Sequence, residues 1–382
     1  MQQTDHLSSV RELAQDVSFS GVARWKEETG GKAIGHFPVF APQEIIRAAG
    51  MLPVGVMGAW GLLEVDYADS RVQSFVCSIA RTTLELGLTG RLKELDGMVF
   101  TDICDVARNL SGVWKRNFPE MLVEYLHLPQ NVTSAASVVY LERELERFKG
   151  KLEDLSGVKV SEDSLREGIE VYNHQRELLQ RIYRIRRESP WLLPADEAYL
   201  LGRAAAQMPV EDHVSLLERS IAEIEARTVK SRDNIRVLLL GPFCEQPPLE
   251  LLRIVEEAGC YVVDDELLQT YRWYTSAVPT NGNPLRSLAE SYIERARLSS
   301  VRYQVRRRRE AIVKWLKEAR AEGVLFCSAK FCEPALYDYV LYKEGLEAAS
   351  VPYLHLEFEE KMSTFETVRM QVETFVESIL FA

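Results

Sequence analysis

The sequence predicts an α/β protein in which two related domains are each built on an open parallel sheet. Three observations predict this fold. A strand–helix–strand pattern occurs in each half of the chain, a long charged helical block lies between the halves, and one short motif occurs twice. Alternating strands and helices are typical of parallel sheets with helices on both faces.

The first strand–helix–strand pattern follows an N-terminal segment, 5–30, that we expect to form one or two short helices. An apolar, strand-like run spans Ala33–Phe40. Pro42 opens a helical segment that Gly50 closes, and a second apolar run, 51–56, comes next. Proline at the start and glycine at the end are the usual signals of a helix.

The second pattern begins with the apolar run Ile235–Leu240. A loop rich in proline, 241–248, leads to an amphipathic helix over Leu249–Ala258, which Gly259 ends. The next strand starts at Cys260. The same order of elements therefore occurs twice along the chain.

The block between the two patterns, 136–230, is charged and helical in character. Ser164 to Glu167 matches a capping box, which predicts a helix that runs through Arg187. A further helix is expected from Glu211 to Arg227. The chain is thus expected to contain four segments: an N-terminal helical segment (1–32), a first α/β domain (33–135), a helical insert or linker (136–230) and a second α/β domain (231–382).

An internal repeat relates the two α/β domains. The run DGMVF leads to Cys104 and the run EGVLF leads to Cys332, each cysteine being followed by an acid. The same interval, 23 residues, then separates Cys104 from His127 and Cys332 from His355, each histidine lying in a YLHL run. We infer two related flavodoxin- or Rossmann-like halves, and we expect both histidines to be buried core residues.

The repeat places a cysteine just past the carboxyl end of one strand in each half. Ligand sites of open parallel sheets lie outside the carboxyl ends of the strands. If the halves face each other, Cys104 and Cys332 converge on one cleft. Cys77 opens a helical segment, where unpaired amides favour a thiolate. Arg81, one turn on, is expected to add to that effect.

Three thiolates from separate loops would select zinc or an iron–sulfur cluster. Cys327 and Cys244 are weaker candidates, since each lies near the end of a strand, and Cys260 is expected in the core. The competing interpretation is that all six cysteines are plain core residues, because free cysteine is among the most buried residue types. For Cys77 alone the alternative is a buried first-turn cysteine.

Composition limits the class of protein further. The chain has 382 residues and a net charge of −11, so it has no global positive field to attract nucleic acid. We see no signal peptide and no apolar run long enough for a membrane span, so a cytoplasmic protein is expected. One basic run, Arg306–Arg309, is either a solvated helix face or a docking patch for a CoA phosphate or an acidic partner.

Several of these motifs together resemble the benzoyl-CoA reductase/2-hydroxyacyl-CoA dehydratase D-component family. The resemblance covers roughly residues 30 to 375 and rests on the segments Cys77-Ser78-x-x-Arg81, Asp102-Ile103-Cys104-Asp105 and Lys330-Phe331-Cys332-Glu333-Pro334. Within the family, the loop GPFCEQPP and the run AGCYVVDD look most like the C (gamma) subunits of ATP-dependent benzoyl-CoA reductases.

The resemblance implies a [4Fe-4S] cluster ligated by Cys77, Cys104 and Cys332. It also implies a related subunit with its own cluster, an ATP-hydrolysing iron–sulfur activator, ferredoxin as electron source and an acyl-CoA substrate. The chain has no GxxxxGK[ST] phosphate loop, which agrees with ATP hydrolysis on another chain. Such reductases add low-potential electrons to the ring of benzoyl-CoA and give a cyclohexadienoyl-CoA, a step of anaerobic aromatic degradation.

Three other functions stay open at this stage. A 2-hydroxyacyl-CoA dehydratase subunit shares the cysteines and works through a ketyl radical with no net use of electrons. A non-catalytic iron–sulfur subunit would relay electrons or act as a scaffold. A metal-free α/β binding protein would use its cysteines as core residues.

Overall fold

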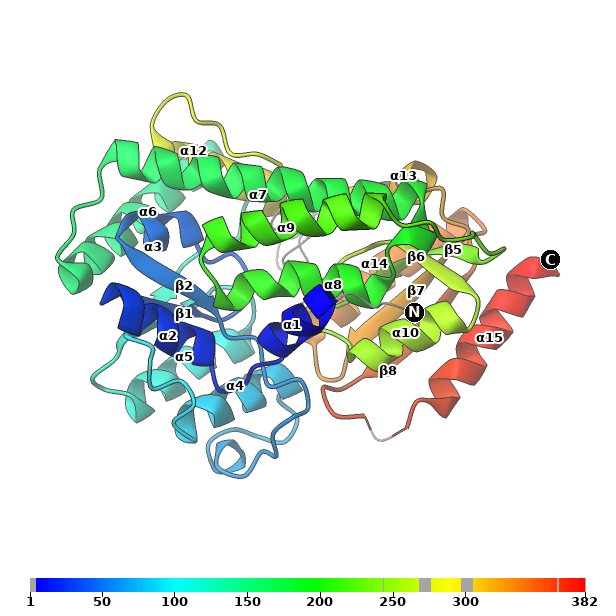
Figure 1. Cartoon of the computed structure of the whole chain (residues 1–382), viewed down its shortest axis with the longest axis horizontal. Helices are drawn as coiled ribbons and strands as arrows, with labels where there is room; N and C mark the ends of the chain where they lie inside the picture. Colours follow the sequence, from blue (N-terminus) through cyan, green and yellow to red (C-terminus); the bar gives the residue numbers. More distant parts are fainter. Residues whose placement is uncertain (1–4, 243, 268–275, 297–304, 363, 382) are drawn as a thin grey trace.

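Two four-stranded, all-parallel sheets form the frame of the protein (Figure 1). Their strand orders, β2-β1-β3-β4 and β6-β5-β7-β8, become identical when β1–β4 are matched to β5–β8. The predicted fold class is therefore confirmed. The strands are β1 (Lys32–His36), β2 (Met51–Gly55), β3 (Gly97–Thr101), β4 (Leu122–Leu126), β5 (Ile235–Leu240), β6 (Cys260–Asp265), β7 (Gly323–Ala329) and β8 (Tyr353–Phe358).

The structure is a computed structural model that describes residues 5–242, 244–267, 276–296, 305–362 and 364–381. The helices around the sheets are α1 (Asp5–Ala14), α2 (Ser20–Thr29), α3 (Gln43–Ala48), α4 (Ser78–Leu88), α5 (Asp105–Asn117), α6 (Ala135–Ser156), α7 (Glu162–Glu188), α8 (Ala195–Ala204), α9 (Val210–Glu225), α10 (Leu249–Glu257), α12 (Pro284–Ala296), α13 (Val305–Ala319), α14 (Glu333–Ala348) and α15 (Glu366–Leu380). Three 3₁₀ turns complete the elements: η1 (Ala68–Ser70), η2 (Pro190–Leu192) and η3 (Ala205–Gln207).

The inner strands are buried along their whole length, whereas the edge strands β4 and β8 are partly exposed. Helices cover both faces of each sheet, which explains the unbroken apolar runs in the sequence. One apolar cluster contains residues of both sheets, such as Ile34 of β1 and Leu239 of β5. The two halves therefore share a continuous core.

The first predicted strand is too long, because β1 ends at His36. The apolar residues that follow, including Phe37 and Phe40, are buried in a loop instead of a sheet. This loop meets the other half of the protein: the Sγ atom of Cys244 lies 3.7 Å from the carbonyl oxygen of Pro38. Apolar residues here report burial between the halves, which the sequence pattern does not distinguish from burial in a strand.

Helix α7 runs along both halves of the molecule (Figure 1). Near its middle, Arg176 forms an ion pair with Glu44 of α3, and near its end Arg186 forms an ion pair with Asp265 of β6. All four side chains have at most 1% exposure. Paired charges at such depth require a fixed geometry, so α7 holds the first and the second sheet at a set distance.

The start of α7 differs from the prediction. Ser161 is the N-cap, and its hydroxyl oxygen accepts a hydrogen bond from the amide of Ser164 at 3.0 Å. The predicted capping box at Ser164 is therefore wrong by one turn. Both serines stand three residues before a polar residue, so spacing alone did not separate them.

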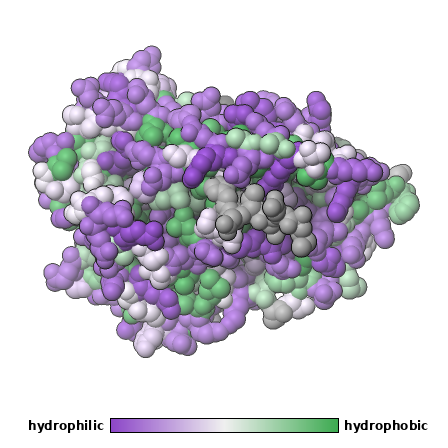
Figure 2. All heavy atoms as spheres, viewed as in Figure 1, coloured by the Kyte–Doolittle hydropathy of each residue, from purple (hydrophilic) through white to green (hydrophobic). Residues whose placement is uncertain are grey.

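The basic run in α13 is only partly described. The side chains of 306–308 lie outside the described residues, and Arg309 forms an ion pair with Glu344 of α14. Figure 2 shows hydrophilic residues over most of one face, with hydrophobic ones gathered at the right-hand tip, where α15 ends. In the described part of the chain, none of the helices combines the length and the apolar character that crossing a bilayer requires.

A buried histidine joins three helices of the central block. His213 of α9 donates from Nε2 to the carbonyl oxygen of Leu201 in α8, at 2.7 Å, and its Nδ1 accepts from Gln175 of α7, at 2.8 Å. Both ring nitrogens are thus satisfied in the neutral form. Burial lowers the pKa of His213 to about 4.

We expect replacement of Arg186 by methionine to lower the free energy of unfolding by about 3–5 kcal/mol, because Asp265 would be left as an unpaired buried charge. The matched control is Arg181→Met on the same helix. Arg181 pairs with Glu225 at the surface, where both side chains are more than 40% exposed, and its loss should cost less than about 1 kcal/mol. Urea denaturation compares the two, and equal losses would contradict the bracing role of α7.

We also expect His213 to make the protein sensitive to acid. The unfolded chain binds a proton at this histidine below pH about 6.5 and the folded chain only below about 4. Stability from this group is therefore present above pH 6.5 and is lost as the pH falls to 4, by about 1.4 kcal/mol per pH unit. Urea denaturation at several pH values should show a shallower fall for His213→Gln, and parallel curves would reject the assignment.

Candidate functional site

The three cysteines predicted as ligands are all N-cap residues of helices. Cys77 caps α4, Cys104 caps α5 and Cys332 caps α14. Helices α5 and α14 follow the matched strands β3 and β7, so the repeat places Cys104 and Cys332 in equivalent positions. A helix N-terminus carries unpaired amides and a partial positive charge, which favour a thiolate.

The electrostatic effects on the thiols show that the three cysteines are neighbours. The pKa of Cys77 is raised well above its usual value, first by burial and then by the charges of Glu245, Cys332 and Cys104. The pKa of Cys104 is also raised by burial, although its Sγ accepts a hydrogen bond from the amide of Ala107 at 3.4 Å. The three thiols therefore approach each other from both halves of the protein.

Among the residues that the structure describes, no three His, Cys, Asp or Glu side chains are arranged to hold a single metal ion. An iron–sulfur cluster makes a different demand, because its cysteines bind separate iron atoms and so stand farther apart than the ligands of one ion. Three buried thiols on three positive helix ends fit such a group. Without a cation, their thiolates would repel each other in a site of low dielectric constant.

The remaining cysteines lie elsewhere. Cys327 is fully buried within β7, not near its end as expected, and burial alone raises its pKa to about 12. Cys260 is fully buried at the start of β6, where burial and then the charge of Glu256 raise its pKa to about 12. Cys244 is buried in the loop after β5, beside Pro38.

Two buried glutamates next to Cys77 were missed by sequence reasoning. Glu245, in the loop after β5, accepts hydrogen bonds from the amides of Ile79 and Glu360 at 3.0 and 3.1 Å. Glu360, in the loop after β8, accepts from the hydroxyl of Thr82 at 3.1 Å. Glu245 is 1% exposed and Glu360 9%. Both acids therefore bind the first turns of the helix that Cys77 caps.

Burial, followed by the charge of Glu360, raises the pKa of Glu245 to about 8. Burial also raises the pKa of Glu360. Two carboxyl groups in one buried site do not both ionise readily, so the pair holds at least one proton near neutral pH. The site can thus store a proton beside the thiols.

A glycine-rich loop after β2 makes room for Glu360. Gly58 and Gly61 have φ values of +73° and +71°, in the left-handed region that favours glycine. A Cβ atom on Gly58 would lie 1.8 Å from Oε1 of Glu360, and one on Gly61 would lie 2.6 Å from its carbonyl oxygen. These glycines let the backbone of the first half approach the acid from the second.

Two expectations about neighbouring side chains are wrong. Arg81 does not act on Cys77, because its guanidinium pairs with Asp69 at 2.6 Å. His127 is exposed just beyond the end of β4, where only its backbone amide bonds to Glu144. His355 is half-buried in β8, and its Nε2 lies 3.0 Å from the hydroxyl of Ser328. Neither histidine contacts the thiols in a described interaction.

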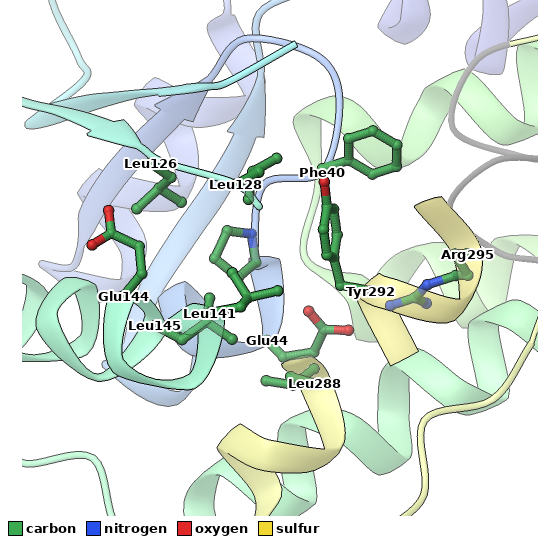
Figure 3. A pocket seen from close by; sticks show the side chains of 11 residues that line it. Phe40, Glu44, Leu126, Leu128, Leu141, Glu144, Leu145, Leu288, Tyr292 and Arg295 are labelled. Carbon is green, nitrogen blue, oxygen red and sulfur yellow. The ribbon is translucent and has the colours of Figure 1, made fainter. Parts of the chain in front are cut away.

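An apolar pocket lies at the carboxyl end of the first sheet, between β4, α6 and α12 (Figure 3). Leucine side chains and Tyr292 surround it, and Glu44 projects toward its floor. Its volume is about 20 Å³, which has room for about one water molecule. It is too small to hold an organic substrate.

Comparison with known proteins adds to this geometry. Residues 38–379 match the family described as 2-hydroxyglutaryl-CoA dehydratase, D-component. The chain is 38% identical to the C (gamma) subunit of benzoyl-CoA reductase from Thauera aromatica, with 99% of each chain covered. It is 30% identical to the (R)-phenyllactyl-CoA dehydratase beta subunit of Clostridium sporogenes, with 94% of each covered. The beta subunit of (R)-2-hydroxyglutaryl-CoA dehydratase from Acidaminococcus fermentans is 29% identical, over 98% of this chain and 100% of that one.

We expect Gly58→Ala to destabilise the protein more than Gly90→Ala. Both glycines have left-handed backbones, with φ values of +73° and +75°, so both variants lose about 1–2 kcal/mol to backbone strain. A Cβ atom on Gly90 meets nothing within 4 Å, whereas one on Gly58 collides with Glu360 and should cost a further 1–3 kcal/mol, roughly. Urea denaturation measures both, and equal losses would contradict the described packing around Glu360.

Proposed function

The chain belongs to the 2-hydroxyglutaryl-CoA dehydratase D-component family, and on this premise we propose that it is the iron–sulfur C (gamma) subunit of an ATP-dependent benzoyl-CoA reductase. The observation that carries the proposal is the meeting of three N-cap cysteines from two sheets. The similarity to a subunit of a benzoyl-CoA reductase over nearly the whole chain supports the choice within the family.

Cys77, Cys104 and Cys332 would hold a [4Fe-4S] cluster, leaving one coordination position for another ligand. When bound, the cluster supplies single electrons of low potential for reduction of the aromatic ring. The helix N-termini stabilise the three thiolates. Cys327 and Cys244 remain the weaker ligand candidates, because no charge of another cysteine acts on Cys327 and Cys244 contacts a backbone carbonyl.

The protein residues around the thiols have their own tasks. Glu245 and Glu360 hold a proton beside Cys77, which suits a reaction that adds protons as well as electrons to the substrate. The shared core of the two halves excludes water from this region and would protect a radical. In this proposal, a related cluster-bearing subunit, an ATP-hydrolysing activator and ferredoxin complete the reductase.

A 2-hydroxyacyl-CoA dehydratase subunit is the second candidate. The family description and two relatives, at 30% and 29% identity, favour it. The two reactions differ in electron balance: ring reduction consumes two electrons for each product, and dehydration consumes none. Product and electron stoichiometry therefore separate them.

The test uses the complex purified without oxygen together with the partner subunits that accompany this chain. With benzoyl-CoA, ATP and a strong reductant, we expect iron, labile sulfide and formation of the cyclohexadienoyl thioester. Cys104→Ser should lower the iron content and abolish turnover, whereas Cys260→Ser, a matched change of a buried cysteine away from the site, should keep both. Iron and sulfide assays and product chromatography give the readout.

Other outcomes would overturn parts of the proposal. Turnover of a 2-hydroxyacyl-CoA alone would indicate the dehydratase. Loss of iron in Cys104→Ser with full activity would indicate a relay or scaffold subunit. Equal iron in Cys104→Ser and Cys260→Ser would reject the ligand assignment, and a complex without iron or sulfide would indicate a metal-free binding protein.

A further inference from the structure

A cavity of about 250 Å³ opens beside the two buried glutamates. Its walls come from α1, from α8, from the loop after β2 and from the start of α10, and Glu360 forms part of its lining. Gln246, the residue after Glu245, also lines it. The cavity is much larger than the pocket in Figure 3 and extends from Glu360 toward α1 and α10, whereas the hydrogen bond from Thr82 joins Glu360 to α4.

The inner wall of this cavity carries a buried cation. Arg203 of α8 is 8% exposed, and its guanidinium lies 4.3 Å from the centre of the Trp60 ring. It donates to the carbonyl oxygen of Met57 at 2.9 Å and to the hydroxyl of Tyr199 at 3.3 Å.

The charge of Arg203 acts on Glu360, where it opposes the effect of burial on the pKa of that carboxyl group. Within the described part of the chain, however, no carboxylate pairs with this guanidinium at contact distance. A buried charge of this kind is costly unless an anion or a polarised oxygen joins it. The cavity therefore has room for an oxygen of a ligand beside the cation.

The mouth of the cavity carries two more cations. Arg11 and Arg253 share one carboxylate, Asp196, at 3.5 and 2.8 Å, and are about one-third exposed. The N-terminus of α10 adds its partial positive charge. Phosphate groups bind at such combinations of guanidinium groups and helix ends.

A second, larger groove of about 760 Å³ continues from this mouth, since Arg11 and Arg253 line both. Lys230 and Arg232 lie along it, together with the aromatic rings of Trp191 and Tyr261. The two spaces therefore form a long path with cations along it, aromatic rings at its outer part and an acid pair at its inner end. A ligand that fits is long, bears phosphates, ends in a heteroaromatic group outside and has a polar carbonyl inside.

We propose that this chain itself binds the acyl-CoA, with the phosphates at Arg11 and Arg253, the nucleotide in the outer groove and the thioester oxygen facing Arg203. The inference rests on the proposed function for the identity of the thioester. Its consequence is that the acyl group approaches Glu245, Glu360 and the thiols from this cavity. Arg203 would then stabilise negative charge that develops on the thioester oxygen when an electron is added.

The test measures binding of benzoyl-CoA and of free CoA to the anaerobic complex by titration calorimetry, without ATP or reductant. Arg203→Met should weaken benzoyl-CoA binding about 10- to 100-fold and free CoA less, because free CoA lacks the thioester oxygen. Arg253→Met should weaken both ligands by a similar factor. Arg203→Lys, which keeps the charge, should recover part of the affinity. Arg219→Met, an exposed arginine of α9 outside both cavities, is the control.

Iron content is measured in the same samples, so the two proposals are tested separately. If Arg203→Met and Arg253→Met contain iron and bind both ligands as tightly as Arg219→Met, the acyl-CoA site lies elsewhere and the inference is overturned. If the complex contains no iron but the two variants still lose affinity, the binding site stands and the proposed function fails. Should Arg203→Met not assemble, the partly exposed Arg253 alone decides the outcome.

Discussion

The two buried ion pairs of α7 are the constraint on which the rest of the structure depends. Arg176 fixes the helix to the first half and Arg186, ten residues later, fixes it to the second. Each sheet alone would present its strand ends to solvent. Because α7 cannot shift without unpairing a buried charge, the carboxyl ends of both sheets face one shared region, and the apolar core between them closes it from water.

This arrangement brings together groups that disfavour each other in isolation. Cys77, Cys104 and Cys332 are near enough for each charge to oppose ionisation of Cys77, and Glu245 adds a further negative group. Their positions at helix ends offset part of the cost, and the proton held by the glutamates offsets another part. A site that collects negative charge in this way is prepared for a cationic inorganic centre, and Gly58 and Gly61 supply the left-handed backbone that the close packing needs.

Local signals in the sequence were sufficient for the strands and for the thiols. Ile235–Leu240 is β5 without change, and Cys77 caps its helix as expected, because apolar runs and helix starts depend on nearby residues. The repeat of Cys104 and Cys332 also holds in the matched topology of the sheets. The ligand role of these cysteines stays a prediction, since position near a helix end does not show what is bound there.

Features that depend on contact between the halves were not predictable. Glu360 stands in an acidic run that is typical of a surface, and only the loop of the other half buries it. His127 looked like a core residue because its strand seemed to continue, whereas β4 ends one residue earlier. No local pattern indicated the cavity at Arg203 either, because four segments far apart in the chain form it.

The central claim is that the two halves bring three distant cysteines to one inorganic centre. Anomalous diffraction at the iron absorption edge, from crystals of the complex grown without oxygen, tests it most directly. The account predicts an iron peak on this chain in bonding contact with the sulfur atoms of Cys77, Cys104 and Cys332. A peak beside Cys244 or Cys327 instead, or no iron on this chain, would contradict it.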